Sequence, residues 1–321
     1  MKKTLIASAV AAAALSSNAF AMDNASDLAE MLESMPEVYG NIQLAQFWSE
    51  VDPKGGSKTS SHEFADGGST IGFKHDHAIT EDLTGFFKAE LEFDADDKAG
   101  NGGLNGFDEA FIGLKGDFGS IQIGSDDTVY EQMLNITDIS EQVGISGNLT
   151  GIGEGDNAQY VGSFGDFTVG LTYKIDGDSA TQRGAQVGGA YSSDAFYVGL
   201  AYSMESDKDY GATKGTDAFG LAAEAYIGDL TLQAQYEDED DTGDYLGLQA
   251  IYGIKATQLA LGYGIYGAEG ADEDAEQLFV QALYNVSDNM YVYVEASQTS
   301  NAGNVKDTDE TATAVGATYA F

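Results

Sequence analysis

Apolar and polar side chains alternate residue by residue along much of this chain, and this period of two constrains its fold more than any other feature. In residues 230–237, Leu, Leu, Ala and Tyr occupy one face while Thr, Gln, Gln and Glu occupy the other. Residues 167–174 and 277–284 largely repeat the pattern. Because successive side chains of a β-strand point to opposite faces, the alternation predicts strands with one apolar and one hydrated face.

Sixteen segments of this kind cover the chain, an even number, as bacterial outer-membrane barrels require. The connections alternate between short turns, as at 165–166 and 228–229, and longer acidic stretches, as at 238–243. That alternation is typical of an up-and-down barrel with its short turns on the periplasmic side. We therefore predict an all-β fold, a 16-stranded antiparallel transmembrane β-barrel over residues 38–321. Its strands begin near residues 38, 69, 84, 107, 119, 157, 167, 185, 195, 216, 230, 244, 256, 275, 290 and 311.

A soluble secreted β-sandwich or a surface adhesin also alternates apolar and polar residues, and is the main structural alternative. Two features favour the barrel. The last strand runs to the final residue, Phe321, and several apolar faces end in an aromatic side chain, as expected at the membrane interfaces. These aromatic residues include Tyr173, Tyr202, Tyr236, Tyr252 and Tyr284.

The first 21 residues have the organisation of a secretory signal peptide. Lys2 and Lys3 precede a short apolar run, which ends in the small-residue sequence Ala19-Phe20-Ala21. We place the mature start at Met22 and treat residues 22–37 as an N-terminal extension. Apolar residues recur at helical spacing within it, so it is either a periplasmic leader or a helix that plugs the lumen.

Composition excludes several classes of function. The net charge of −39 repels nucleic acid and anionic lipid, so neither is an expected ligand. No cysteine is present, which rules out disulfides and thiol chemistry. No nucleophile elbow, Ser-His-Asp set or phosphate loop occurs, so an outer-membrane protease or lipase is disfavoured. We expect no enzyme activity, no cofactor and no metal site.

Three stretches carry a family resemblance. Residues 69–74 (STIGFK), 110–115 (AFIGLK) and 118–124 (FGSIQIG) resemble the second, fourth and fifth strands of Gram-negative general porins. Tyr319 and the terminal Phe321 resemble the signal that barrel assembly machinery recognises. The chain as a whole is similar to the trimeric, 16-stranded porins, of the type found in Vibrio and other marine gammaproteobacteria.

The resemblance implies a homotrimer in the outer membrane, in contact with lipid and lipopolysaccharide. It also implies that a third external loop folds inward and narrows the pore. Residues 125–156, the longest stretch without alternation, stand where that loop is expected. The acidic pore-constriction residues it would contribute are Asp126, Asp127, Glu131, Asp138 and Glu141.

The wall opposite that loop departs from the pattern of enteric porins, which place arginines there. Thr70 stands at the strand-two position, and the strand-four position falls on Asp108 or Glu109. Lys74 and Lys88 are the expected inward-facing cations, and glutamates share the strand face of Lys88. The transverse field of the enteric constriction is therefore weak or lost here, and the lumen should prefer cations.

The sequence predicts an outer-membrane porin, with a water-filled channel for passive diffusion of small hydrophilic solutes and preferentially of cations. An oligosaccharide-selective porin, similar to those for chitooligosaccharides or maltooligosaccharides, is the alternative. It is favoured by the N-terminal extension and by aromatic residues of the predicted lumen face, such as Phe86, Tyr197, Tyr291 and Tyr293.

Overall fold

The computed structural model describes residues 35–96, 104–144, 152–175, 184–205 and 216–321. The predicted signal peptide and nearly all of the predicted N-terminal extension lie outside these ranges. Among the described residues, no helix is long and apolar enough to cross a membrane.

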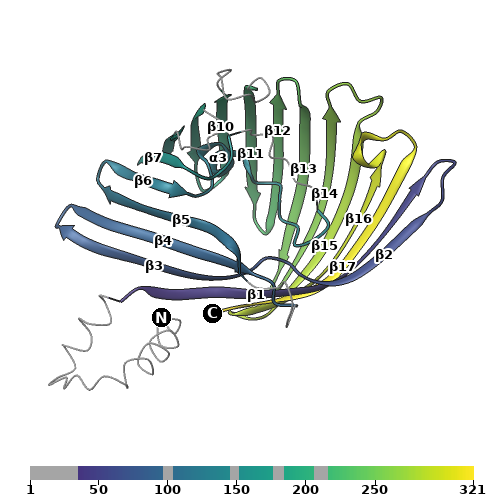
Figure 1. Cartoon of the computed structure of the whole chain (residues 1–321), viewed down its shortest axis with the longest axis horizontal. Coiled ribbons are helices and arrows are strands. Elements are labelled where there is room, and N and C mark those ends of the chain that lie inside the picture. Colours follow the sequence, from purple (N-terminus) through teal and green to yellow (C-terminus); the bar gives the residue numbers. More distant parts are fainter. Residues whose placement is uncertain (1–34, 97–103, 145–151, 176–183, 206–215) are drawn as a thin grey trace.

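Antiparallel strands form a single sheet that closes on itself (Figure 1). From β3 onward each strand pairs with the next one in sequence, and the last strand pairs with the first. The strands are β1 (Glu37–Pro53), β2 (Thr59–Asp66), β3 (Ser69–Thr80), β4 (Leu83–Phe93), β5 (Leu104–Gly116), β6 (Gly119–Ser125), β7 (Asn157–Phe164), β8 (Phe167–Lys174), β9 (Gly184–Ser192), β10 (Phe196–Glu205), β11 (Ala218–Ile227), β12 (Leu230–Glu239), β13 (Gly243–Ile254), β14 (Thr257–Ala268), β15 (Ala275–Ser287), β16 (Met290–Ser300) and β17 (Thr308–Ala320). A helix, α3 (Val129–Leu134), and a 3-10 turn, η1 (Ala302–Asn304), complete the described elements.

β2 and β3 occupy one strand position of the barrel. Both pair with the same edge of β1, β3 over residues 37–41 and β2 over residues 44–51. The register shifts by one residue at Gly67 and Gly68, where Gly68 has a φ of 104° that suits glycine. Counting the interrupted pair once gives the predicted closed barrel of sixteen strands. The separate segment 59–66 was not predicted.

The seam that closes the barrel lies between its first and last strands, β1 and β17. Residues 41–53 of β1 pair with β17, and beyond them Phe321 and Gly40 exchange two backbone hydrogen bonds of 3.0 and 3.2 Å. A Cβ on Gly40 would lie 2.9 Å from the Phe321 ring, so glycine leaves room for that side chain. This pairing of the first strand with the last closes the sheet, so that neither strand presents an unpaired edge to lipid at the seam.

Polarity is inverted relative to a water-soluble protein. On β8, the side chains of Phe167, Val169, Leu171 and Tyr173 are 43–58% exposed, while Thr172 is fully buried. The same alternation runs round the sheet, with apolar residues outside and amides, hydroxyls and carboxylates inside. The aromatic residues predicted for the membrane interfaces all point outward, with 37–58% of their surface exposed. An apolar exterior over a polar interior is the arrangement of a transmembrane barrel.

Candidate functional site: the loop inside the barrel and the facing wall

The connection between β6 and β7 contacts the inner face of the wall rather than extending outward. Its helix α3 lies inside the curve of the sheet, against β8, β9, β10 and β11 (Figure 1). The helix buries Val129, Tyr130, Met133 and Leu134 almost completely. The sequence predicted this stretch only as an irregular loop, so the helix is a finding of the structure.

Glycines on the inner face of the wall make room for this helix. A Cβ on Gly170 would lie 2.7 Å from Val129, and one on Gly188 would lie 2.8 Å from Met133. A Cβ on Gly220 would lie 2.1 Å from Leu134. Any larger residue at these positions would push the helix into the lumen, because packed interiors do not absorb added methyl groups freely.

The first turn of α3 is fixed by two sets of hydrogen bonds. Thr128 caps the helix, and the Glu131 carboxylate accepts hydrogen bonds from the Thr128 N–H at 2.7 Å and its hydroxyl at 2.8 Å, forming a capping box. Side chains of the wall accept hydrogen bonds from two more backbone N–H groups. Thr172 accepts from Val129 at 2.9 Å, and Gln186 accepts from Tyr130 at 3.1 Å. These contacts fix the direction in which the helix leaves β6.

Beyond α3, the loop continues along the wall. Gln235 on β12 accepts hydrogen bonds from the backbone N–H and the hydroxyl of Thr137, at 3.2 and 2.8 Å. The Thr137 hydroxyl also lies 3.2 Å from the Tyr245 hydroxyl on β13. Gln281 on β15 then donates to the carbonyl of Ile139 at 3.0 Å. Inward amides thus hold successive parts of the loop.

One buried glutamate holds the end of this stretch of the loop. Glu295 on β16 is 1% exposed, and its two carboxylate oxygens accept the backbone N–H groups of Glu141 and Gln142 at 2.7 and 2.9 Å. Gln281 donates to the same carboxylate at 2.8 Å. Such charge-assisted hydrogen bonds are stronger than neutral ones. Glu295 was not predicted as a site residue.

Glu141, a predicted constriction residue, turns its side chain toward the wall. Its carboxylate accepts hydrogen bonds from Gln43 on β1 at 2.7 Å and from the Tyr291 hydroxyl on β16 at 3.0 Å. Burial raises the pKa of Glu141, although the hydrogen bond from Tyr291 opposes the shift. Asp138, predicted for the same acidic tip, is hydrogen-bonded to Ser140 at 3.3 Å.

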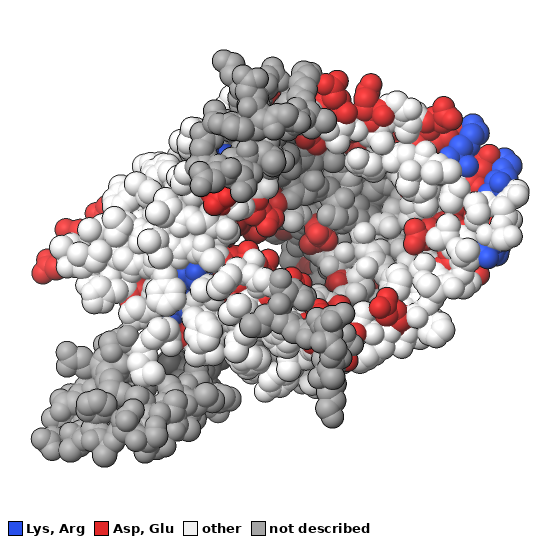
Figure 2. All heavy atoms as spheres, viewed as in Figure 1, with Lys and Arg blue, Asp and Glu red and all other residues white. Residues whose placement is uncertain are grey.

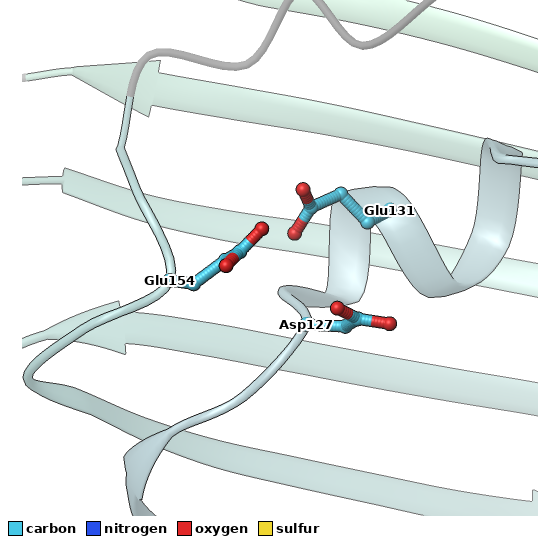
Figure 3. A group of neighbouring side chains, drawn as sticks. All are labelled: Asp127, Glu131 and Glu154. Atoms are coloured by element: carbon cyan, nitrogen blue, oxygen red, sulfur yellow. The ribbon is translucent and has the colours of Figure 1, made fainter. Parts of the chain in front are cut away.

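Carboxylates gather where the loop leaves β6 and returns to β7. The carboxylate oxygens of Asp127, Glu131 and Glu154 lie within 4.8 Å of one another, with Glu131 and Glu154 directed toward each other (Figure 3). The backbone N–H of Asp126 donates to the Glu154 carbonyl at 3.2 Å and so ties the two ends of the loop together. We assign no metal to this group, because Asp127 and Glu154 are exposed and such carboxylates often cluster without an ion.

The proximity of these groups shifts their protonation. Although the Glu154 side chain is exposed, partial desolvation raises its pKa to about 7, and the adjacent Glu131 contributes to the shift. Burial also raises the pKa of Asp126 to about 6, with Glu109 and Asp127 adding to the effect and a hydrogen bond from Gln122 opposing it. These loop carboxylates therefore take up protons at a higher pH than ordinary carboxylates.

The facing wall supplies carboxylates and cations in contact. Lys88 on β4 forms ion pairs with Glu109 on β5 and, at 3.9 Å, with Glu90. Lys74 on β3 lies 3.5 Å from Glu37 and 5.0 Å from the centre of the Tyr39 ring. Both predicted cations thus have acidic partners, and neither stands as an isolated positive charge.

The predicted site residues of the loop fall into two groups in space. Asp126, Asp127 and Glu131 lie at the start of the loop. Partial desolvation raises the pKa of Asp127; the charges of Glu131 and of the β5 residues Glu109 and Asp108 add to the shift, and Lys88 on β4 opposes it. Asp138 and Glu141 belong to the far end, against β12–β16 and β1. Figure 2 shows a hollow in this face of the molecule with carboxylates gathered around it and few basic residues.

Sequence comparison identifies the family. A family model described as Gram-negative porin matches residues 7–304. Two curated relatives are each 28% identical over the full length of both chains: a monosaccharide porin from a Halomonas species and the major outer membrane protein of Halomonas elongata. A solved structure, the anion-selective porin from Comamonas acidovorans, covers 89% of this chain and 99% of its own with a TM-score of 0.72 at 20% identity.

This chain belongs to the Gram-negative porin family. It is an outer-membrane channel protein and not an enzyme, as the sequence predicted. The likeness to the anion-selective porin concerns the fold alone, so the charge preference of this channel has to be argued from its own residues.

Proposed function

We propose that this porin forms a water-filled channel for small hydrophilic solutes, that residues 126–144 narrow it, and that it prefers cations to anions. One observation carries the proposal: the loop and the facing wall present carboxylates to each other, and the lysines among them are already paired with acids. A narrow pore between low-dielectric walls focuses the field of its lining charges and concentrates counter-ions.

The site residues have different roles in this proposal. Asp108, Glu109, Asp127 and Glu131 supply the negative potential around the first half of the loop. Asp126 and Glu154 add to it above their raised pKa values of about 6 and about 7, and Asp138 adds charge at the far end. Glu141 acts mainly through the position of the loop, because its carboxylate is occupied by Gln43 and Tyr291. Lys74 and Lys88 limit the acidity of the wall without reversing its sign.

A reversal potential across a KCl gradient tests the charge preference. The full-length protein in a planar bilayer should pass K⁺ in preference to Cl⁻ at about 0.01 M salt, where the Debye length is near 30 Å. The preference should fade at about 1 M, where that length is near 3 Å. The double variant Asp127→Asn, Glu154→Gln should move the potential toward zero, and Asp138→Asn, Glu141→Gln should move it in the same direction.

A matched control separates lumen charges from distant ones. Asp240→Asn with Asp272→Asn also removes two carboxylates, but from external connections, and should leave the potential nearly unchanged. Anion preference in the unmodified protein would overturn the proposal. So would two lumen double variants with unaltered selectivity, because the controlling charges would then lie elsewhere.

A sugar-selective channel is the second candidate. The full-length relative described as a monosaccharide porin favours it, and inward tyrosines such as Tyr197 and Tyr291 offer polar and aromatic contacts. Residues 22–35 are proposed either to plug such a channel or to form a periplasmic leader. Deleting them should lengthen open times in single-channel records if they plug the lumen, and identical gating would identify a leader.

Assembly is proposed from the family likeness. The chain forms a homotrimer, in contact with outer-membrane lipid and lipopolysaccharide, after insertion by the barrel assembly machinery. Conductance steps in groups of three, from protein extracted without dissociation, would support the trimer. Single steps of uniform size would count against it.

A further inference from the structure

Between the wall and the start of the loop, beside the proposed ion path, lies a polar cavity. It has a volume of about 220 Å³ and is lined by Ser120, Gln122, Asp126, Gln132, Gln159 and Val161. One water needs only roughly 10–15 Å³ in such a space, so the cavity has room for a solute the size of a single sugar ring.

Strands β6 and β7, the start of the loop and helix α3 build this cavity. Ser120 pairs with Val161, and Gln122 pairs with Gln159, in neighbouring rows of β6 and β7. Their side chains face inward, because the intervening Ile121 on β6 is 50% exposed on the outer surface. Asp126 at the start of the loop and Gln132 on α3 complete the lining.

Hydrogen bonds fix these walls in place. The Asp127 carbonyl accepts from the side-chain amides of both Gln132 and Gln159, each at 2.8 Å. Gln132 also donates to Gln159 at 3.4 Å, and Gln122 donates to the carboxylate of Asp126. A site whose groups are already held loses less conformational freedom when a ligand binds.

The polar atoms of the lining that still have hydrogen-bonding capacity suit a polyol. Among the hydrogen bonds of the described residues, the amide oxygens of Gln122 and Gln132 accept none. Asp126 keeps acceptor capacity, because a carboxylate has about four lone-pair sites. Gln122 and Gln159 each retain a second amide hydrogen. Neighbouring sugar hydroxyls donate and accept at once, and a hydroxyl bound to a carboxylate forms a strong, charge-assisted bond.

We propose that this cavity is a binding subsite for a single sugar ring, with Gln122 and Asp126 as its principal contacts and Val161 against the apolar edge of the ring. The inference rests on the proposed passage of small hydrophilic solutes. It adds a site in the channel wall at which one class of these solutes binds during passage. An uncharged polyol fits better than a cation, because most of the lining is neutral amide and hydroxyl. The subsite lies beside the loop, so an occupied cavity narrows the remaining path.

Glucose is the probe, and current through the full-length channel in a planar bilayer is the readout. Rising glucose should reduce the current along a saturating curve, beyond the linear fall caused by viscosity. Gln122→Met keeps the size of the side chain but removes its polar atoms. It should raise the half-saturating glucose concentration by about fivefold, which corresponds to about 1 kcal/mol. Asp126→Asn should have an effect of similar size.

Two control variants make the result specific. Gln233→Met changes a glutamine on β12, away from the cavity, and should leave the half-saturating concentration unaltered. Asp127→Asn removes a neighbouring charge that does not line the cavity, and should change ion selectivity without changing glucose saturation.

Three results would overturn the subsite. The first is a purely linear effect of glucose on the unmodified channel, and the second is an equal response of Gln122→Met and Gln233→Met. The third is saturation by ethylenediamine that depends on Asp126 and not on Gln122, which would identify a cation site. A channel that conducts ions normally but shows no saturation refutes only the subsite, whereas a protein that forms no channel refutes the proposed function as well.

Discussion

The anchoring of the loop by Glu295 gives a prediction whose size follows from the structure. Glu295→Gln keeps the shape of the side chain but replaces one carboxylate oxygen with an NH₂ group, which cannot accept a hydrogen bond. One of the two backbone N–H groups, of Glu141 or Gln142, then loses its acceptor. The other N–H group then donates its hydrogen bond to the neutral amide oxygen of the glutamine.

Hydrogen bonds to charged groups contribute about 1.5–3 kcal/mol, against about 0.5–1.5 kcal/mol for neutral ones. Losing one charged bond and weakening the other should therefore cost the docked loop about 2–4 kcal/mol. Because about 1.4 kcal/mol is a factor of ten, the detached population should rise roughly thirtyfold to a thousandfold.

Single-channel recording measures this change directly. We expect Glu295→Gln to give a larger mean conductance and more frequent transitions between levels, while the thermal stability of the barrel stays close to that of the unmodified protein. Glu224→Gln on β11 is the matched control, since Glu224 also lies on an inward-facing strand position but forms none of these bonds to the loop. If Glu295→Gln conducts and fluctuates as the unmodified channel does, Glu295 does not hold the loop.

Three further predictions test other parts of the structure. Gly188→Val should displace α3 from the wall into the lumen and lower conductance, whereas Gly189→Val, whose Cβ would have no neighbour closer than 3.5 Å, should not; equal conductance in the two variants would show that Gly188 does not make room for the helix. Phe321→Ala should lower the amount of protein in the outer membrane, because it removes the terminal side chain at the seam, and normal levels in a membrane fraction would contradict this. Lowering the pH from about 8 to 5 should weaken the K⁺ preference, since Glu154, with a pKa of about 7, and Asp126, with a pKa of about 6, bind protons and lose negative charge as the pH falls below those values; a reversal potential that stays constant over this range would argue against it.

The sequence by itself determined the barrel. The side-chain period of a strand is local, so alternation along each segment was enough to predict which residues face lipid and which face the lumen. Turn length and the even number of segments then implied the topology. Tyr173 and Tyr284 point outward and Tyr197 and Tyr291 inward, as predicted.

Only the tertiary structure decided how the loop is held and which charges meet. Gly188 and Gly220 are merely small residues in an alternating sequence until α3 is seen packed against them. Glu295 lies 154 residues from Glu141, and no local pattern links them. Glu154 joins Asp127 and Glu131 because the returning chain bonds to Asp126. Contacts between distant segments depend on which way a loop folds, and a sequence period carries no information about that direction.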